Sequence, residues 1–167
     1  MLDEAIYTTP PHPEWSGAAL VGMDGRLLGI GSLFVQEAID DKALKGNLFV
    51  PVDVIEPILE DLLTRGRPSS LPRPWLGMYT GEDNGRLVVG GIATDGPADA
   101  AGVQPGDVVV EVAGKRVTGL AELFRNEWRQ GPAGTKIALG LLREGAPIRV
   151  DVLSGDRADF LRKPRLQ

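Results

Sequence analysis

The sequence contains no cysteine and only one histidine among its 167 residues. These absences exclude disulfide scaffolds, cysteine nucleophiles, zinc fingers and zinc-dependent hydrolases, because none of them forms without thiolates or several imidazole groups. No apolar run approaches the roughly 20 residues that span a bilayer, and the N-terminus is acidic, so the sequence predicts neither a membrane helix nor a signal peptide. We expect no metal and no cofactor.

Basic residues are scarce in the first part of the chain. Residues 1–61 hold 11 acids and 3 bases, a balance of −8, whereas residues 62–167 hold 12 acids and 15 bases, a balance of +3. The net charge of −5 argues against nucleic acid and anionic membranes as partners, because both need clustered Lys and Arg. The change of sign along the chain predicts two units.

Glycine and proline are abundant, with 22 and 13 residues, which predicts many turns and short strands. Three of the prolines fall within residues 66–74, a segment without hydrophobic periodicity that we interpret as an extended linker. The predicted organisation is a first domain at 1–65, the linker, a second domain at 75–154 and a C-terminal tail at 155–167.

The first domain is predicted to contain three strands. Asp24 and Gly25 form a strong turn signal between two apolar runs, so we expect a hairpin with strands at 18–23 and 26–31. A third strand is expected at 48–52. Three strands are too few to close a barrel or a sandwich, so this part of the chain resembles the end of a larger domain.

A short amphipathic helix is predicted to end the first domain. Apolar residues recur at helical spacing over 55–63. Asp53 is the expected N-cap, and Gly66 is the expected stop.

The second domain shows a more complete pattern of elements. Helices are predicted at 97–102 and 120–129, the second closed by a Gly-Pro pair. Five segments read as strands, namely 76–80, 86–93, 107–113, 135–143 and 147–153. Five strands and two helices in about 80 residues fit a compact α+β sandwich.

Three segments of the second domain resemble PDZ domains. The most specific is 96–109, with the sequence GPADAAGVQPGDVV, and 114–117 (GKRV) resembles the turn that follows it. Residues 75–78 (WLGM) resemble the loop that binds the terminal carboxylate of a peptide in that family. The resemblance implies a PDZ β-sandwich with two helices.

Residues 13–30 resemble the segment around the nucleophile of trypsin-like serine proteases of the HtrA group, and Ser16 falls on the nucleophile position. The resemblance continues through the strand at 49–52 and the following helix, and so covers nearly the whole chain. It implies a mainly β or α+β chain in which 1–65 is an incomplete second β-barrel of a trypsin-like domain, followed by the PDZ domain.

The resemblance implies that the chain is the C-terminal portion of an HtrA-like serine endopeptidase whose PDZ domain binds the C-termini of peptides or proteins. In that family the catalytic histidine and aspartate lie in the first barrel, upstream of the residues present here, so we expect this chain itself to be inactive. The missing N-terminal barrel is an expected partner, and the chain could form a homo-oligomer. The resemblance also implies a periplasmic or cell-envelope location.

The alternative interpretation is a pseudoprotease or a non-enzymatic PDZ scaffold. In the resembled family the residue two places before the nucleophile is usually glycine, because its N–H helps to form the oxyanion hole, whereas here Glu14 and Trp15 precede Ser16. Glu14 places a negative charge beside a site that must stabilise one, which opposes a contribution of about 3–4 kcal/mol per donor. The retained Ser16-Gly17 pair favours the protease.

His12 is the only candidate for a local base, since it lies four residues before Ser16. Pro11 and Pro13 flank it and stiffen the chain, so the ring has little freedom to fold back onto the serine. We expect His12 to be an exposed loop residue.

The candidate peptide site can be stated on physical grounds. An exposed strand edge beside a helix accepts an extended peptide as a further strand. Successive backbone N–H groups around Gly77 could hold a carboxylate, and glycine permits close approach. The candidate peptide-binding residues are Trp75, Leu76, Gly77, Met78, Leu120, Leu123 and Phe124.

Overall fold

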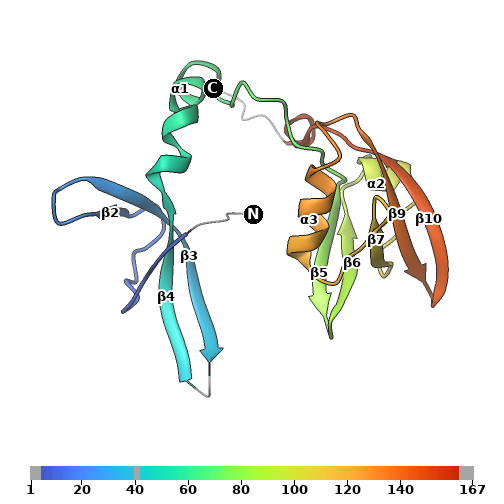
Figure 1. The fold of residues 1–167 in the computed structure, drawn as a ribbon, viewed down its shortest axis with the longest axis horizontal. Coiled ribbons are helices and arrows are strands. Elements are labelled where there is room, and N and C mark those ends of the chain that lie inside the picture. Colours follow the sequence, from blue (N-terminus) through green and yellow to red (C-terminus); the bar gives the residue numbers. More distant parts are fainter. Residues whose placement is uncertain (1–4, 40–41, 162–167) are drawn as a thin grey trace. The chain divides into compact units, whose positions relative to one another are not determined.

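The computed structural model describes residues 5–39 and 42–161 (Figure 1). The chain divides into two compact units, Met1–Ser69 and Ser70–Gln167, and the division falls inside the segment interpreted as a linker. No helix within the described stretches is both long and apolar enough to cross a membrane. Of the tail expected at 155–167, residues 162–167 lie outside the description.

The described part of the first unit forms a four-stranded antiparallel sheet in the order β1-β4-β3-β2. The strands are β1 (Ile6–Thr8), β2 (Ala19–Val21), β3 (Leu27–Ile39) and β4 (Lys42–Pro51). The strands predicted at 18–23, 26–31 and 48–52 are confirmed, since they overlap β2, β3 and β4. We did not predict β1, because three residues are too few to show alternation, and it is defined only by pairing with β4.

The predicted turn between β2 and β3 is confirmed. Gly25 adopts a left-handed φ of 80°, and the Arg26 N–H donates to the Asp24 Oδ1 over 3.1 Å. Asp and Gly are favoured at such a turn because one supplies a local acceptor and the other a positive φ at no steric cost.

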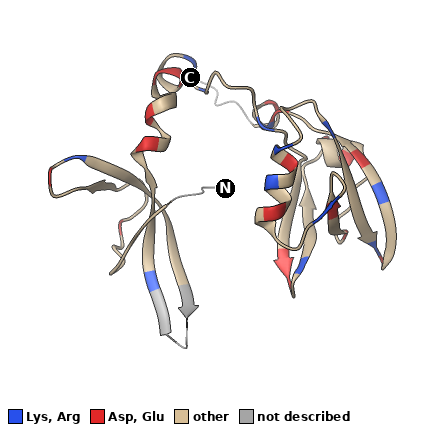
Figure 2. Ribbon diagram, viewed as in Figure 1, with Lys and Arg blue, Asp and Glu red and all other residues tan. Residues whose placement is uncertain are grey.

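The helical segment begins later than predicted. Two 3-10 turns, η1 (Val52–Val54) and η2 (Glu56–Ile58), precede the helix α1 (Leu59–Arg65), whose N-cap is Ile58, so the predicted start with Asp53 as N-cap is wrong. The physical reason is Pro57, which has no N–H and disfavours α geometry in the residue before it. Gly66 closes α1 as predicted, with φ 70°. Figure 2 shows acidic positions along this segment.

The first unit has almost no hydrophobic core of its own. Phe49, 6% exposed, is the only large apolar side chain that the described residues of this unit bury. Many others on its strands, turns and helix are open to solvent, namely Val21, Met23, Leu27, Leu28, Ile30, Leu33, Phe34, Val54, Leu59, Leu62 and Leu63. Burying one such side chain stabilises a fold by about 1.5–3 kcal/mol, so this open sheet lacks the layer that would cover it.

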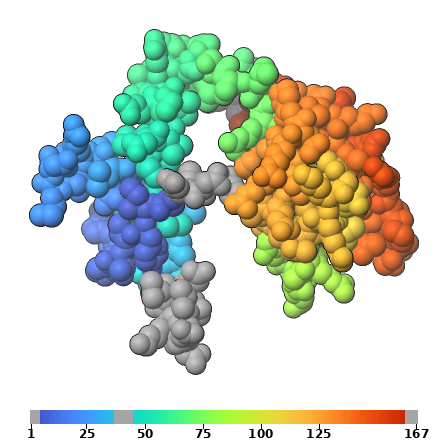
Figure 3. All heavy atoms as spheres, in the orientation of Figure 1, coloured from blue at the N-terminus to red at the C-terminus, as the bar shows by residue number. Residues whose placement is uncertain are grey.

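The second unit contains one six-stranded sheet, with β10-β9-β7-β6-β5 in order and β8 paired to β7. The strands are β5 (Met78–Asp83), β6 (Arg86–Ile92), β7 (Val108–Val112), β8 (Lys115–Arg116), β9 (Lys136–Arg143) and β10 (Ala146–Leu153). The helices are α2 (Pro97–Ala100) and α3 (Leu120–Trp128), and a 3-10 turn, η3 (Arg157–Phe160), follows the last strand. Figure 3 shows this unit, light green through red, as one continuous body.

Every predicted element of the second unit is confirmed, and the structure adds β8 and η3. Its core is made of thirteen buried side chains, which are Leu76, Leu87, Val89, Ala98, Val103, Val109, Val112, Val117, Leu123, Ile137, Leu139, Leu141 and Val152. The expected fold class, an incomplete barrel segment followed by an α+β domain, is therefore confirmed.

An ion pair between a buried carboxylate and a partly exposed guanidinium ties the loop before β7 to β9. The Asp107 side chain is 1% exposed and receives two hydrogen bonds of 2.8 Å from the Arg143 guanidinium, through Nε and Nη2. The Gln104 N–H donates to the same carboxylate, and the Arg143 Nη2 also donates to the Gly102 carbonyl. These hydrogen bonds lower the pKa of Asp107, with the Arg143 contribution the largest.

Candidate functional site

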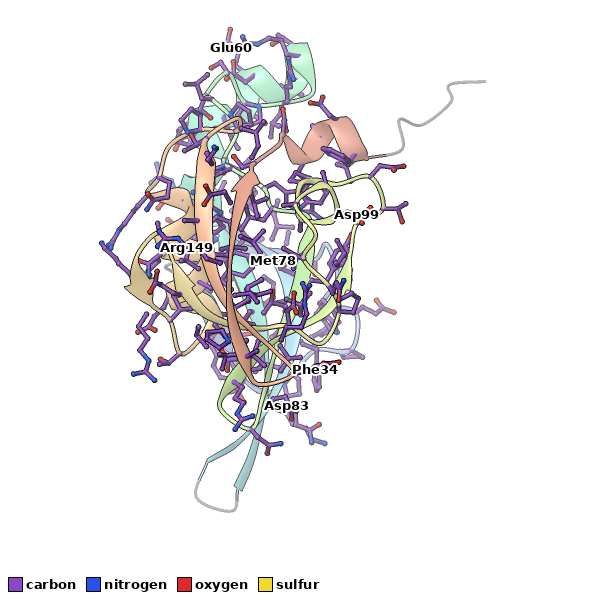
Figure 4. All side chains as sticks on the ribbon, turned by 90° about the vertical axis from the view of Figure 1, so that its right-hand side faces the viewer. Phe34, Glu60, Met78, Asp83, Asp99 and Arg149 are labelled. Atoms are coloured by element: carbon purple, nitrogen blue, oxygen red, sulfur yellow. The ribbon has the colours of Figure 1, made fainter. Side chains whose placement is uncertain are left out.

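β5 lies at one edge of the sheet in the second unit. Within the described residues it pairs only with β6, so its other edge is open, and α3 packs beside it (Figure 1). Figure 4 labels Met78 and Asp83, which begin and end this strand. An open edge carries backbone donors and acceptors that can pair with an added strand.

The loop before β5 presents two unused backbone donors. The carbonyls of Trp75, Leu76 and Gly77 accept from the N–H groups of Gly155, Ala98 and Ala93 over 2.9, 2.8 and 2.7 Å. By contrast, neither the Leu76 N–H nor the Gly77 N–H donates a hydrogen bond to any part of the chain that the structure describes. Gly77 has a φ of 74°. Consecutive free N–H groups at a left-handed residue form a nest that suits an anion.

The seven candidate peptide-binding residues fall into three groups. Met78, Leu120 and Phe124 are half-buried side chains of β5 and α3 that pack on the edge of the core. We call these three the apolar strip. Leu76 and Leu123 are 2% and 1% exposed, so their side chains belong to the core.

Trp75 and Gly77 make up the third group, in which the contacts are with the chain itself. The Trp75 ring packs against Phe160, with ring centroids 4.8 Å apart. A Cβ built on Gly77 would lie 3.3 Å from the Trp75 ring and 3.2 Å from Cδ of Pro97. The Trp75 ring therefore covers Gly77.

Glu82 joins the edge strand to the helix, and the sequence did not reveal this role. Its Oε1 accepts from the Leu120 N–H at the start of α3 over 2.8 Å. The sequence EDNG predicts a turn, and a turn does form, at Asn84 and Gly85 with φ 48° and 71°. No local signal could link two positions 38 residues apart.

α3 also carries a buried carboxyl. Glu127 is 3% exposed, and burial raises the pKa of its carboxyl from 4.5 to about 8. Desolvation disfavours the charged form, so this side chain is largely protonated at neutral pH. Among the described residues no cluster of three His, Cys, Asp or Glu side chains could hold a metal ion.

Ser16 lies exposed in a tight turn of the first unit. The Ala18 N–H donates to the Trp15 carbonyl over 3.1 Å, and Gly17 adopts a φ of 74°. The Gly17 N–H donates to the carbonyl of Gly31 in β3 over 2.9 Å, which ties the turn to that strand. The turn is therefore well anchored.

His12 turns towards the backbone of Glu14 and not towards Ser16. The His12 Nδ1 accepts from the Glu14 N–H over 3.2 Å, and the backbone N–H of His12 donates to the Asn47 Oδ1 over 2.7 Å. No hydrogen bond joins His12 to Ser16 in the described chain. The exposed ring agrees with the expectation of a loop residue.

The second unit is a PDZ domain. Residues 74–153 match the profile of the family described as PDZ domain. Over most of its length the chain is also a relative of the HtrA and DegP serine proteases. It is 30% identical over 160 residues to the protein "Probable periplasmic serine endoprotease DegP-like" of Halomonas elongata. The aligned region covers 89% of this chain and 32% of the relative.

A second curated relative supports the same family. The serine protease Do-like HtrA of Bacillus subtilis is 26% identical over 151 residues, covering 80% of this chain and 33% of the relative. The chain therefore spans about a third of the length of the curated relatives it matches.

Solved structures agree with the sequence comparison. The HtrA-type protease AlgW with decapeptide is 26% identical, with a TM-score of 0.56 over 96% of this chain and 48% of that one. The serine endoprotease from Yersinia pestis is 28% identical, with a TM-score of 0.52 over 82% of this chain and 46% of that one.

Proposed function

We propose that this chain captures peptides or protein C-termini that end in an apolar residue with a free carboxylate. The observation that carries this proposal is the pair of unpartnered N–H groups of Leu76 and Gly77 at the start of an open edge strand. The relatives support it, because PDZ domains bind peptides and a related protease structure contains a decapeptide.

The position of the nest determines the direction of the bound peptide. A peptide whose carboxylate sits at Leu76 and Gly77 ends where β5 begins, so it runs antiparallel to β5. Side chains of an extended peptide alternate between two faces. The last and third-last side chains then face α3, where the apolar strip of Met78, Leu120 and Phe124 receives them.

The test is a titration of a labelled peptide of six or more residues ending in Val or Leu, compared with the same peptide amidated at its C-terminus. We expect the free acid to bind with micromolar affinity. The amide should bind at least about tenfold more weakly than the free acid, because hydrogen bonds to a charged group are worth about 1.5–3 kcal/mol each. Equal affinities would show that the nest is not used.

A variant pair checks the apolar strip. Phe124→Ala removes a half-buried ring beside β5 and should weaken binding of the free peptide at least fivefold. Arg149→Ala on β10, at the opposite edge of the sheet, is the matched control and should bind as the parent does. Gly77 is unsuitable for this purpose, because a side chain there would be strained by its φ and would press on Pro97.

We further propose that the first unit contributes no proteolysis in this chain. The Glu14 N–H, which by resemblance would help to form an oxyanion hole, donates instead to His12. That hydrogen bond favours the pseudoprotease or scaffold interpretation over an active protease. In an active protease that contained this segment, the catalytic His and Asp would have to come from a first barrel outside these residues.

The missing barrel is the partner that we propose for the first unit. The open sheet and its exposed apolar side chains support this proposal, because a covering layer would bury them. The periplasmic relatives support a cell-envelope location.

A further inference from the structure

We call the loop before β5, Trp75 to Gly77, the carboxylate loop. Backbone hydrogen bonds from a distant part of the chain hold it in place. Trp75 and Gly155 exchange two backbone hydrogen bonds, of 3.0 Å from the Trp75 N–H and 2.9 Å from the Gly155 N–H. They form an isolated antiparallel bridge between the loop and the residues that follow β10. The segment after the last strand is thus part of the loop's support.

Aromatic and proline side chains pack around this bridge. The Trp75 and Phe160 rings are 4.8 Å apart at an interplanar angle of 47°. A Cβ built on Gly155 would lie 3.1 Å from the Phe160 ring and 3.3 Å from Cγ of Pro97. We call Trp75, Pro97, Gly155 and Phe160 the aromatic clamp. With Gly77 beneath the Trp75 ring, the clamp lies directly against the nest.

Peptide planarity transmits the clamp's position to the nest. In a trans peptide unit the C=O and the following N–H point in opposite directions, so fixing one fixes the other. The Trp75 carbonyl, held by Gly155, therefore sets the direction of the Leu76 N–H. The Leu76 carbonyl, held by the Ala98 N–H at the start of α2, sets the direction of the Gly77 N–H in the same way.

Phe160 reaches the clamp from η3. The Asp156 Oδ1 accepts from the Ala158 N–H over 2.9 Å, and the Asp159 N–H donates to the Asp156 carbonyl over 3.1 Å. This capped turn brings the Phe160 ring back onto Gly155 and Trp75. Phe160 itself is 42% exposed, and its ring contacts are with Trp75 and Gly155.

We propose that Phe160 is a positioning residue for carboxylate recognition: through Trp75 it keeps the Leu76 and Gly77 N–H groups aimed at the peptide terminus. This inference rests on the proposed function. Trp75 accordingly acts by holding the loop, and not by touching the peptide. The segment after the PDZ sheet is then required for selectivity although it lies outside the strip that binds side chains.

The experiment measures carboxylate selectivity, the ratio of the dissociation constants of the amidated and the free peptide, in the full chain. Phe160→Ala should raise the dissociation constant of the free peptide about fivefold or more and leave that of the amidated peptide unchanged, so the ratio falls towards one. Phe160→Tyr keeps the ring and should restore the parent ratio. Leu161→Ala, at an exposed apolar neighbour, is the matched control and should keep it too.

A structural role alone predicts a different result. It would lower the melting temperature of Phe160→Ala while the folded protein kept the parent selectivity, and that outcome would overturn the inference. Phe160→Leu keeps apolar bulk without an aromatic ring and replaces Phe160→Ala if the latter does not fold; a parent-like ratio in Phe160→Leu overturns the inference equally. If the parent chain itself shows no selectivity, the proposed function fails first, and the two failures are distinguishable.

Discussion

Glu127 is a carboxyl group that α3 carries into the interior of the second unit, where 3% of the residue is exposed. Burial raises its pKa from 4.5 to about 8, so the folded chain keeps a proton there that the unfolded chain releases. The resulting stability is complete below pH 4.5 and is lost as the pH rises through about 8.

Glu127→Gln should remove this pH dependence. The variant should match the parent near pH 5 and exceed its free energy of unfolding by about 4 kcal/mol at pH 9, because the unfolded chain releases the proton above about pH 4.5, the folded chain keeps it until about pH 8, and one pKa unit corresponds to about 1.4 kcal/mol. Urea denaturation at the two pH values measures the difference. Glu122→Gln on the same helix is the control, because hydrogen bonds from Thr118 lower the pKa of that carboxyl and it stays ionised across this range. A parallel pH dependence in Glu127→Gln and parent would contradict the assignment.

Ser16 should not react as a nucleophile in this chain. A serine needs a base within hydrogen-bond reach, and the His12 Nδ1 is occupied by the Glu14 N–H. Incubation with a fluorophosphonate probe should give no labelling, while trypsin labels in the same buffer. Labelling of the parent that Ser16→Ala abolishes would show that a base reaches Ser16 after all.

At the scale of elements, the loop from Gly102 to Asp107 is attached to β9 by one ion pair. Asp107→Ala removes both hydrogen bonds from Arg143 and leaves the Gln104 N–H without its acceptor. We expect a loss of about 2–3 kcal/mol in unfolding free energy at pH 7, less than a fully buried pair would cost because Arg143 is 31% exposed.

Chemical denaturation measures this loss, with Asp151→Asn at an exposed position on β10 as the control. The lowered pKa of Asp107 means that its contribution is present above about pH 4 and is lost as the pH falls below that value. The gap between parent and Asp107→Ala should therefore narrow in acid. A constant gap from pH 7 to pH 2 would rule out the ion pair as its source.

At the scale of the whole molecule, the first unit buries one large apolar side chain and the second buries a full core. We expect the chain to self-associate through the first unit, because its exposed strand edges and apolar side chains have no cover within the unit. Analytical ultracentrifugation should show a dimer or larger species.

A charge on the open sheet should disperse that assembly. Leu33→Lys, at a side chain 55% exposed on β3, should shift the chain towards monomer, whereas Leu153→Lys, 63% exposed on β10, should not. A monodisperse parent monomer whose first unit tumbles freely would contradict the expectation.

Local signals account for most of the fold. The Asp24-Gly25 turn, the Gly66 stop and the strands of the second unit were all predictable, because turn residues and alternation act over a few positions. The start of α1 was not, since apolar spacing continues through Pro57 while the proline imposes 3-10 geometry. β1 and η3 were missed because their partners, β4 and Trp75, lie far away in sequence.

The sequence by itself determined that the chain has two units, that the second resembles a PDZ domain, and that Leu76–Met78 begins a candidate carboxylate site. Those features depend on residue types at short spacing. Only the tertiary structure decided how the candidate side chains lie: those of Leu76 and Leu123 are buried in the core, while those of Met78, Leu120 and Phe124 are half-buried and pack on its edge. It also placed Phe160 against Trp75, 85 residues earlier, because burial and ring packing depend on which segments meet and not on the order in which they occur.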